Sequence, residues 1–170
     1  MIWIFAYGSL IFRPSFDSLE RRPAVVSGYA RRFWQGSPDH RGVPEAPGRV
    51  VTLVPLAGAK CTGVAYRIDV EGSEEVLAAL DHREIAGFVK RKLPVFDPGG
   101  DAHFAEAITY VADEANPHFL GPLDERAIAE HVKKSRGPSG PNDEYVLRLR
   151  AALTELGHVD DHVEAIARWL

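Results

Sequence analysis

The chain has 170 residues, of which 45% are hydrophobic and 26% are charged. This length and composition fit one folded domain and exclude a disordered segment, so we expect residues 1–170 to form a single domain. Twenty Lys and Arg residues stand against 24 Asp and Glu residues, which gives a formal net charge of -4. No overall positive field would attract nucleic acid, and a nucleic-acid partner is not expected.

Cysteine content and hydrophobic runs bear on the compartment. Cys61 is the single cysteine, which excludes an intrachain disulfide and a cysteine-based zinc cage and is typical of a reducing compartment. The N-terminal segment MIWIFAYGSL lacks the basic start and the cleavage pattern of a signal peptide. No run approaches the roughly 20 apolar residues that cross a bilayer. We therefore expect a soluble, cytoplasmic protein without a membrane partner.

Strands are predicted through the first two-thirds of the chain. Six segments are rich in β-branched or aromatic residues and are bounded by glycine and proline. They are Ile2–Tyr7, Val25–Trp34, Arg49–Val54, Cys61–Asp69, Val89–Phe96 and Phe104–Val111. Pro94 cannot donate a ladder hydrogen bond, so its strand is expected at an edge or a bulge. Short strands of this kind indicate a curled sheet or a small barrel.

A long segment rich in glycine and proline separates the second and third predicted strands. It reads GSPDHRGVPEAPG at Gly36–Gly48 and has no hydrophobic period. Loops of this length are uncommon in compact domains and are often functional. A lid that excludes water from a site and a mobile connector both fit this composition.

Helices are predicted after the strands, at Leu123–Lys134, Glu144–Leu156 and Asp160–Leu170. Each opens with acidic residues, which favour the positive end of a helix dipole. Asn142 lies just before the second of these helices and is its expected N-cap. Strands followed by helices predict an α+β fold.

A further helix is predicted over SEEVLAALDHREIAGF, Ser73–Phe88, with its first residue as N-cap and Gly87 as the stop. Val76 and Leu80 share an apolar face at helical spacing, and Glu84 is the next residue on that face. The pattern therefore directs a carboxylate toward the protein interior.

A buried carboxylate is costly, so Glu84 is expected to be neutralised, paired or retained for chemistry. Ile85 and Phe88 are expected to supply its apolar surroundings. In the alternative interpretation, the helix ends near Arg83 and Glu84 is a solvated terminal residue paired with Arg83 or Lys90. Periodicity alone leaves both interpretations open.

The tetrapeptide Tyr7-Gly8-Ser9-Leu10 directly follows the first predicted strand. A glycine after a strand lets the backbone turn sharply and expose consecutive N–H groups, which suits a carboxylate or a developing oxyanion. Taken alone, the four residues are a weak signal, and a plain turn explains them more simply.

Three other groups of residues carry chemistry in some proteins. Cys61 opens a predicted strand and is interpreted as a buried structural thiol. His158 and His162 have the spacing of a metal pair but lack an H-E-x-x-H frame, so we interpret them as a solvated helix start and predict no metal site. Arg41 follows Asp39-His40 in the Gly/Pro loop; its planar guanidinium suits bidentate pairing with a substrate carboxylate, but apart from a family resemblance all three are interpreted as ordinary polar loop residues.

Taken together, these motifs resemble the ChaC-like, glutathione-specific gamma-glutamylcyclotransferases. The shared blocks occur in order and cover nearly the whole chain except the last predicted helix. They are FAYGSLIF at 5–12, RRFWQGSPDHRGVPEAPGRVVTLV at 31–54, GVAYR at 63–67, LDHREIAGF at 80–88 and GPSGPNDEYV at 137–146. The resemblance implies a small mixed β-barrel with flanking and C-terminal helices.

The resemblance also implies an activity and its residues. The turn formed by Tyr7, Gly8, Ser9 and Leu10 would cradle the gamma-glutamyl group, and Tyr145 would line the same pocket. Glu84 would be the catalytic acid and base in a reaction that converts glutathione to 5-oxoproline and cysteinylglycine without a cofactor.

Two alternative interpretations of the function remain open. One is a cyclotransferase for other gamma-glutamyl peptides or amines, and the other is a non-catalytic module that binds a gamma-glutamyl ligand. The chain also departs from the family pattern, because relatives usually carry R-E-K-G-G-Y where residues 83–88 read REIAGF, and Trp where Phe12 stands. We expect these changes to leave Glu84 in a more apolar setting.

Overall fold

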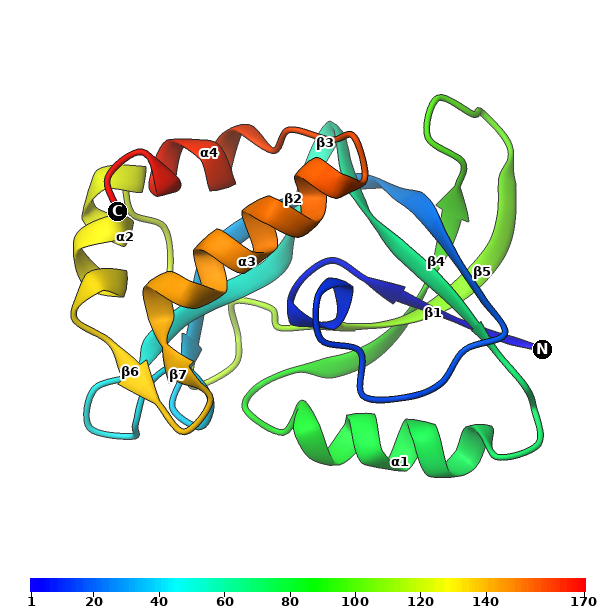
Figure 1. The fold of residues 1–170 in the computed structure, drawn as a ribbon, viewed down its shortest axis with the longest axis horizontal. Coiled ribbons are helices and arrows are strands. Elements are labelled where there is room, and N and C mark those ends of the chain that lie inside the picture. The colour runs from blue at the N-terminus through cyan, green and yellow to red at the C-terminus, as the bar shows by residue number, and fades with distance from the viewer.

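The computed structural model describes residues 1–170 and is built around a closed barrel of mixed strands (Figure 1). The strand order is β1-β3-β2-β4-β5. The strands are β1 (Ile2–Ala6), β2 (Glu20–Ser37), β3 (Gly48–Ile68), β4 (Val89–Phe96) and β5 (His103–Val111). Strand β1 pairs antiparallel with β3 and parallel with β5, and this second pairing closes the barrel. The predicted fold class is confirmed.

The two longest strands form one bent antiparallel pair. The prediction of separate strands at Arg49–Val54 and Cys61–Asp69 is wrong, because β3 runs without interruption for 21 residues and pairs with β2 on both sides of its bend. The register shifts between Ser27 and Tyr29, and the glycines at this bend, Gly28 and Gly58, have φ angles of 81° and 78°. Glycine tolerates this left-handed conformation, so the strand continues through residues that read as a turn.

Pro94 lies in a strand that is paired mainly on one side. Strand β4 is matched with β5 along its length but meets β2 only at Phe96, opposite Val25. A register shift follows directly, between Val95 and Phe96. The expected edge or bulge position of this proline is confirmed.

Helices α2 (Glu125–Lys133), α3 (Asn142–Glu155) and α4 (Asp161–Ala167) pack against one another, and α1 (Ser73–Arg83) lies apart from them (Figure 1). All of the predicted helices exist, although their ends shift by a few residues. None of them is both long and apolar enough to cross a membrane.

Helix α1 is shorter than predicted at its C-terminal end. Its N-cap is Gly72 and not Ser73, whose hydroxyl donates to the Val70 carbonyl at 2.8 Å. The last helical hydrogen bond runs from Glu84 N to Leu80 O at 2.9 Å. The backbone angles of Glu84 itself are no longer helical. A turn ending at Gly87, with a φ of 90°, then leads into β4.

The start of α3 anchors the end of the Gly/Pro loop. Asn142 is not the N-cap, which is Pro141. The Asn142 side chain instead accepts from Arg49 N at 2.7 Å and donates to Arg49 O at 2.8 Å. The amide therefore joins α3 to the first residues of β3.

A short hairpin of β6 (Arg136–Gly137) and β7 (Gly140–Pro141) packs against the same loop. Ser139 N donates to His40 O at 2.9 Å. A Cβ atom at Gly137 would lie 2.3 Å from that carbonyl oxygen, so a side chain could not be accommodated. The Gly/Pro loop is thus held by backbone contacts in this structure and is not a free connector.

Candidate active site

One pocket brings together all of the site residues that the sequence predicts. It lies where the turn after β1, the Gly/Pro loop, the end of α1 and the first turns of α3 converge. The predicted residues that line it are Tyr7, Gly8, Ser9, Leu10, Arg41, Glu84 and Tyr145. Apolar side chains, among them Phe12, Val51 and Phe88, complete its wall.

Glu84 places a largely buried carboxylate in this pocket. Its side chain is 16% exposed, and the nearest cation is Arg83, whose Nε lies 3.7 Å from Glu84 Oε1. Within residues 1–170, no side chain or backbone group donates a hydrogen bond to the Glu84 carboxylate. Burial raises the pKa of Glu84, although the nearby charges of Arg83 and His40 oppose this shift.

Neither interpretation of the sequence is fully right about Glu84. The helix ends at Arg83, as the alternative interpretation holds, yet the side chain lines the pocket and only 16% of it is exposed. Lys90 does not pair with it, because Lys90 Nζ binds Asp81 at 2.8 Å. The expectation that Ile85 surrounds the carboxylate is wrong, since Ile85 is 68% exposed.

The turn after β1 presents unused backbone donors to the pocket. Ser9–Ile11 forms a single 3-10 turn, closed by a hydrogen bond from Ile11 N to Gly8 O at 3.0 Å. The N–H group of Gly8, just before that turn, and those of Ser9 and Leu10, its first two residues, have no acceptor within the protein. Consecutive free N–H groups form a concavity suited to a negatively charged or carbonyl oxygen.

Arg83 connects this turn with Glu84; the sequence offered it as a partner of Glu84 but not as a contact of the turn. Its Nη2 donates to Ser9 Oγ at 2.8 Å, while its Nε faces the Glu84 carboxylate. The signal for this role was the Arg-Glu pair in the block at residues 80–88. The contact fixes the spacing between the donors of the turn and the carboxylate.

Tyr145 contributes an aromatic wall with one polar atom. The side chain is buried and stands edge-on to Phe12 and Phe33, with ring centroids 5.8 Å away in both cases. Burial raises the pKa of Tyr145 to about 12, so the hydroxyl is neutral at physiological pH.

Two further tyrosines support the pocket from the barrel. Tyr7 donates its hydroxyl proton to the Tyr110 carbonyl at 2.6 Å, and burial raises the pKa of Tyr7. Tyr110 also lines the pocket and donates to Asp81 Oδ1 at 2.6 Å. Tyr110 was missed because its strand position carries no motif.

Arg41 is a buried cation in the pocket wall. Its Nη1 donates to Pro141 O at 2.9 Å and lies 3.9 Å from Glu144 Oε2. The guanidinium carbon is 5.7 Å from the centroid of the Tyr145 ring. Its Nε and Nη2 groups form no hydrogen bond within the protein and remain for a ligand.

The other candidates of the sequence have structural surroundings. Cys61 is 2% exposed, which confirms the buried thiol, and burial raises its pKa. His162 is buried, so the prediction of a solvated helix start is wrong for this residue. Its Nε2 accepts from Phe33 N at 3.0 Å and its Nδ1 lies 3.3 Å from Glu125 Oε1, so both ring nitrogens have protein partners.

Comparisons with known proteins agree with the barrel fold. The fold matches a crystal structure of a glutathione-specific gamma-glutamyl cyclotransferase from yeast, with a TM-score of 0.88 and 29% identity over 99% of this chain and 96% of that one. The molecule therefore has the fold of the gamma-glutamylcyclotransferases.

Relatives in sequence point to a narrower group. The chain is 40% identical to gamma-glutamylcyclotransferase 2-3 of Arabidopsis thaliana, across 98% of this chain and 86% of that protein. It is also 40% identical to glutathione-specific gamma-glutamylcyclotransferase 1 of Homo sapiens, across 97% of this chain and 76% of that protein. The model of the ChaC-like protein family matches residues 2–169. The chain belongs to the ChaC-like family.

Proposed function

We propose that this protein is a gamma-glutamylcyclotransferase that converts glutathione to 5-oxoproline and cysteinylglycine. The observation that carries the proposal is the Glu84 carboxylate, which is buried without a hydrogen-bond donor in the same pocket as the free N–H groups of Gly8–Leu10. The names of its relatives at 40% identity support glutathione as the substrate.

The reaction takes place within one gamma-glutamyl group. Its α-amine nitrogen attacks the side-chain amide carbonyl, a C–N bond forms to close the five-membered ring, and the bond to the cysteine nitrogen breaks. The attacking nitrogen enters as an ammonium and loses two protons on becoming the ring amide. Glu84 passes them one at a time to the leaving nitrogen, which departs as an ammonium, so protons and atoms balance without a cofactor. Because nucleophile and carbonyl belong to one molecule, holding the reactive conformer contributes up to roughly 7–11 kcal/mol.

Proton transfer explains why the base is buried. An α-ammonium of pKa about 8 and an ordinary Glu of pKa about 4.3 differ by about 3.7 pH units, or about 5 kcal/mol of uphill transfer. The burial that raises the pKa of Glu84 narrows this gap, and it lowers the pKa of an ammonium group bound beside it. A solvated carboxylate would lack this advantage.

The remaining pocket residues hold the substrate in this proposal. The N–H groups of Gly8, Ser9 and Leu10 stabilise the oxyanion that forms on the attacked carbonyl, and Tyr7 supports the turn. Tyr145 packs against the gamma-glutamyl chain. The free Nε and Nη2 of Arg41 bind the glycine carboxylate of glutathione.

The proposal places the protein in the cytosol, where glutathione keeps protein thiols reduced. The free, buried Cys61 is compatible with that setting.

The test is an assay for 5-oxoproline with two substrates. The purified protein is incubated with glutathione and, separately, with gamma-glutamyl-alanine, and Glu84→Gln serves as the matched control that keeps the shape and removes basicity. We expect 5-oxoproline from glutathione with the wild type and none with the folded variant. Product from gamma-glutamyl-alanine alone would assign another gamma-glutamyl substrate, and a fully active Gln variant would remove Glu84 from the mechanism.

A further inference from the structure

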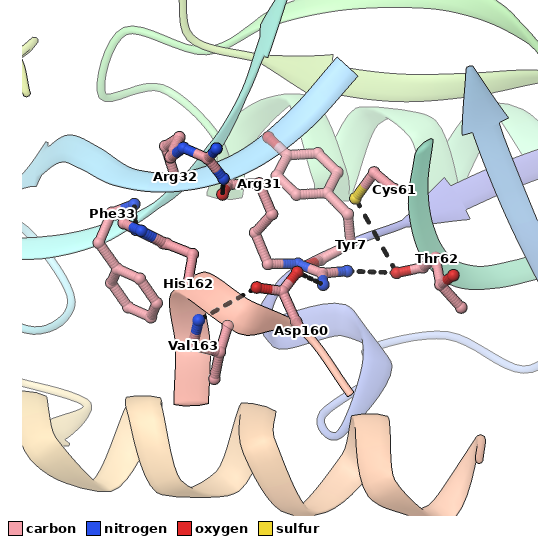
Figure 2. A network of polar contacts seen from close by, with 9 residues as sticks. All are labelled: Tyr7, Arg31, Arg32, Phe33, Cys61, Thr62, Asp160, His162 and Val163. Atoms are coloured by element: carbon pink, nitrogen blue, oxygen red, sulfur yellow. Dashed lines mark hydrogen bonds and ion pairs between the residues drawn. The ribbon is translucent and has the colours of Figure 1, made fainter. Parts of the chain in front are cut away.

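A buried arginine lies directly behind the Tyr7–Leu10 turn. Arg31 of β2 is 1% exposed, and its guanidinium donates to three acceptors from different parts of the chain (Figure 2). Nε donates to Tyr7 O at 2.7 Å, Nη1 donates to Asp160 Oδ2 at 2.7 Å, and Nη2 donates to Thr62 O. A guanidinium in the protein interior is tolerated only when its charge is paired and its donors are satisfied.

Asp160 supplies the balancing charge and ties the C-terminal helix to the turn. Its Oδ2 accepts from Arg31, while its Oδ1 accepts from Val163 N at 3.0 Å and caps α4 (Figure 2). The carboxylate is largely buried, with 14% of its side chain exposed. One acidic residue therefore performs two separable tasks, one with each oxygen.

The peptide group between Tyr7 and Gly8 links this ion pair to the pocket. Its carbonyl oxygen accepts from Arg31, and its N–H belongs to Gly8, which lines the pocket and has no acceptor in the protein. A cation bound to the carbonyl fixes the peptide plane and polarises the amide, which makes the N–H at its other end a stronger donor. The orientation of the free donors thus depends on a contact outside the pocket.

We infer that Arg31 and Asp160 are positioning residues for the cyclisation: together they orient the Tyr7–Gly8 peptide so that its N–H meets the developing oxyanion. Neither side chain is among the pocket-lining residues, so both act through the turn. The inference rests on the proposed function. It also makes the segment before α4, which lies outside the shared motif blocks, a working part of the site.

The test separates the ion pair from the helix cap. Asp160→Asn keeps an oxygen that can cap Val163 N–H and removes the charge that holds Arg31. Asp161→Asn is the matched control, because Asp161 is the next residue, is exposed and lies in the first turn of the same helix. Both variants and the wild type are melted, and kcat and KM for glutathione are measured well below the lowest melting temperature.

We expect Asp160→Asn to lower kcat at least about 10-fold while KM stays within about twofold, because the lost contact serves the transition state. Asp161→Asn is expected to keep both constants. Arg31→Lys, which keeps a cation beside Asp160 but cannot reach all three acceptors, is expected to show the same loss of kcat. This second variant decides the question if Asp160→Asn does not fold.

Two results would overturn the inference while leaving the proposed function standing. One is an active wild type with a folded Asp160→Asn variant of unchanged kcat. The other is a loss of activity that matches the unfolded fraction, which would give the pair a purely structural role. A wild type that forms no 5-oxoproline would instead overturn the proposed function, and this inference with it.

Discussion

A Cβ atom built on Gly8 would lie 2.9 Å from the hydroxyl oxygen of Tyr145, and equally close to Cγ2 of Val51. The φ angle of Gly8 is -130°, outside the left-handed region that favours glycine, and the close approach of these two side chains is what requires a residue without a Cβ atom. The turn that carries the free N–H groups therefore closely approaches Tyr145 and Val51 on the pocket wall.

This contact predicts the effect of Gly8→Ala. The added methyl group forces the turn away from Tyr145, which costs about 1–3 kcal/mol of stability as overpacking does in cores. We expect a lower melting temperature and at least a 10-fold lower kcat/KM (~1.4 kcal/mol). Gly100→Ala is the control, because its new Cβ would approach Asp97 no closer than 3.3 Å. A fully active Gly8→Ala protein would contradict the proposed position of the turn.

Replacing Glu84 by Gln is predicted to stabilise the protein at neutral pH. Because burial raises the pKa of Glu84, the folded state holds this proton more tightly than the unfolded state, and wild-type stability falls as pH rises from the ordinary pKa of a glutamate through the raised pKa. Each unit by which the pKa in the folded state exceeds that in the unfolded state corresponds to about 1.4 kcal/mol in the free energy of unfolding. Urea unfolding of both proteins between pH 4 and pH 8 measures the effect.

Glu130→Gln is a control variant for which we expect the opposite change in stability. A hydrogen bond from Lys133 lowers the pKa of Glu130, so its contribution to stability is present above its ordinary pKa and is lost as pH falls. The Glu130 variant should be slightly less stable than the wild type at neutral pH. A Glu84 variant that behaves in the same way would mean that the Glu84 carboxylate is solvated.

The charge of Arg83 is predicted to set the acidic limb of the pH–rate profile. Arg83 lowers the pKa of Glu84, so Arg83→Met, which keeps much of the side-chain length, should raise this pKa further. The base then stays protonated to higher pH, and the acidic limb of the kcat/KM profile shifts to higher pH. Lys90→Met, which removes a cation bound to Asp81, should leave the limb in place. Equal profiles for all three proteins would exclude Glu84 as the titrating base.

Arg41 is predicted to distinguish substrates by their carboxylate. Arg41→Lys removes the planar pair of donors, and the loss of a charge-assisted hydrogen bond costs about 1.5–3 kcal/mol, or a KM for glutathione raised at least about 10-fold. A gamma-glutamyl methylamide, which has no glycine carboxylate, should show no such penalty. Arg148→Lys is the control, since Arg148 pairs with Glu144 and is half exposed. A penalty of equal size for both substrates would assign Arg41 to the gamma-glutamyl end.

The end of α1 shows how much of the local structure hydrophobic periodicity can predict. Spacing placed Glu84 on the face of Leu80, and the carboxylate is indeed buried, but the helix stops one residue earlier. What directs the side chain inward is the turn up to Gly87. A Cβ atom at Gly87 would lie 2.3 Å from Asn116 Oδ1, so this turn is packed against a distant segment. No local pattern could predict that contact.

Arg31 shows a second limit of prediction from the sequence. A charged residue inside the apolar strand 25–34 was visible in the sequence, but its acceptors were not. Thr62 comes from β3, Tyr7 follows β1, and Asp160 lies 129 positions away. A local signal can show that a buried charge needs partners, and only the packed chain supplies them.

The sequence by itself determined the α+β class, most of the strand and helix segments, the glycine turn and the carboxylate motif. These features depend on propensities and spacings within a few residues, and such preferences survive in almost any surroundings. The tertiary structure alone decided that β1 closes the barrel against β5, that the Glu84 carboxylate has no hydrogen-bond donor, and that an ion pair from the C-terminal segment lies behind the turn. Burial and electrostatics depend on groups far apart in the chain, so they exist only once the chain is folded.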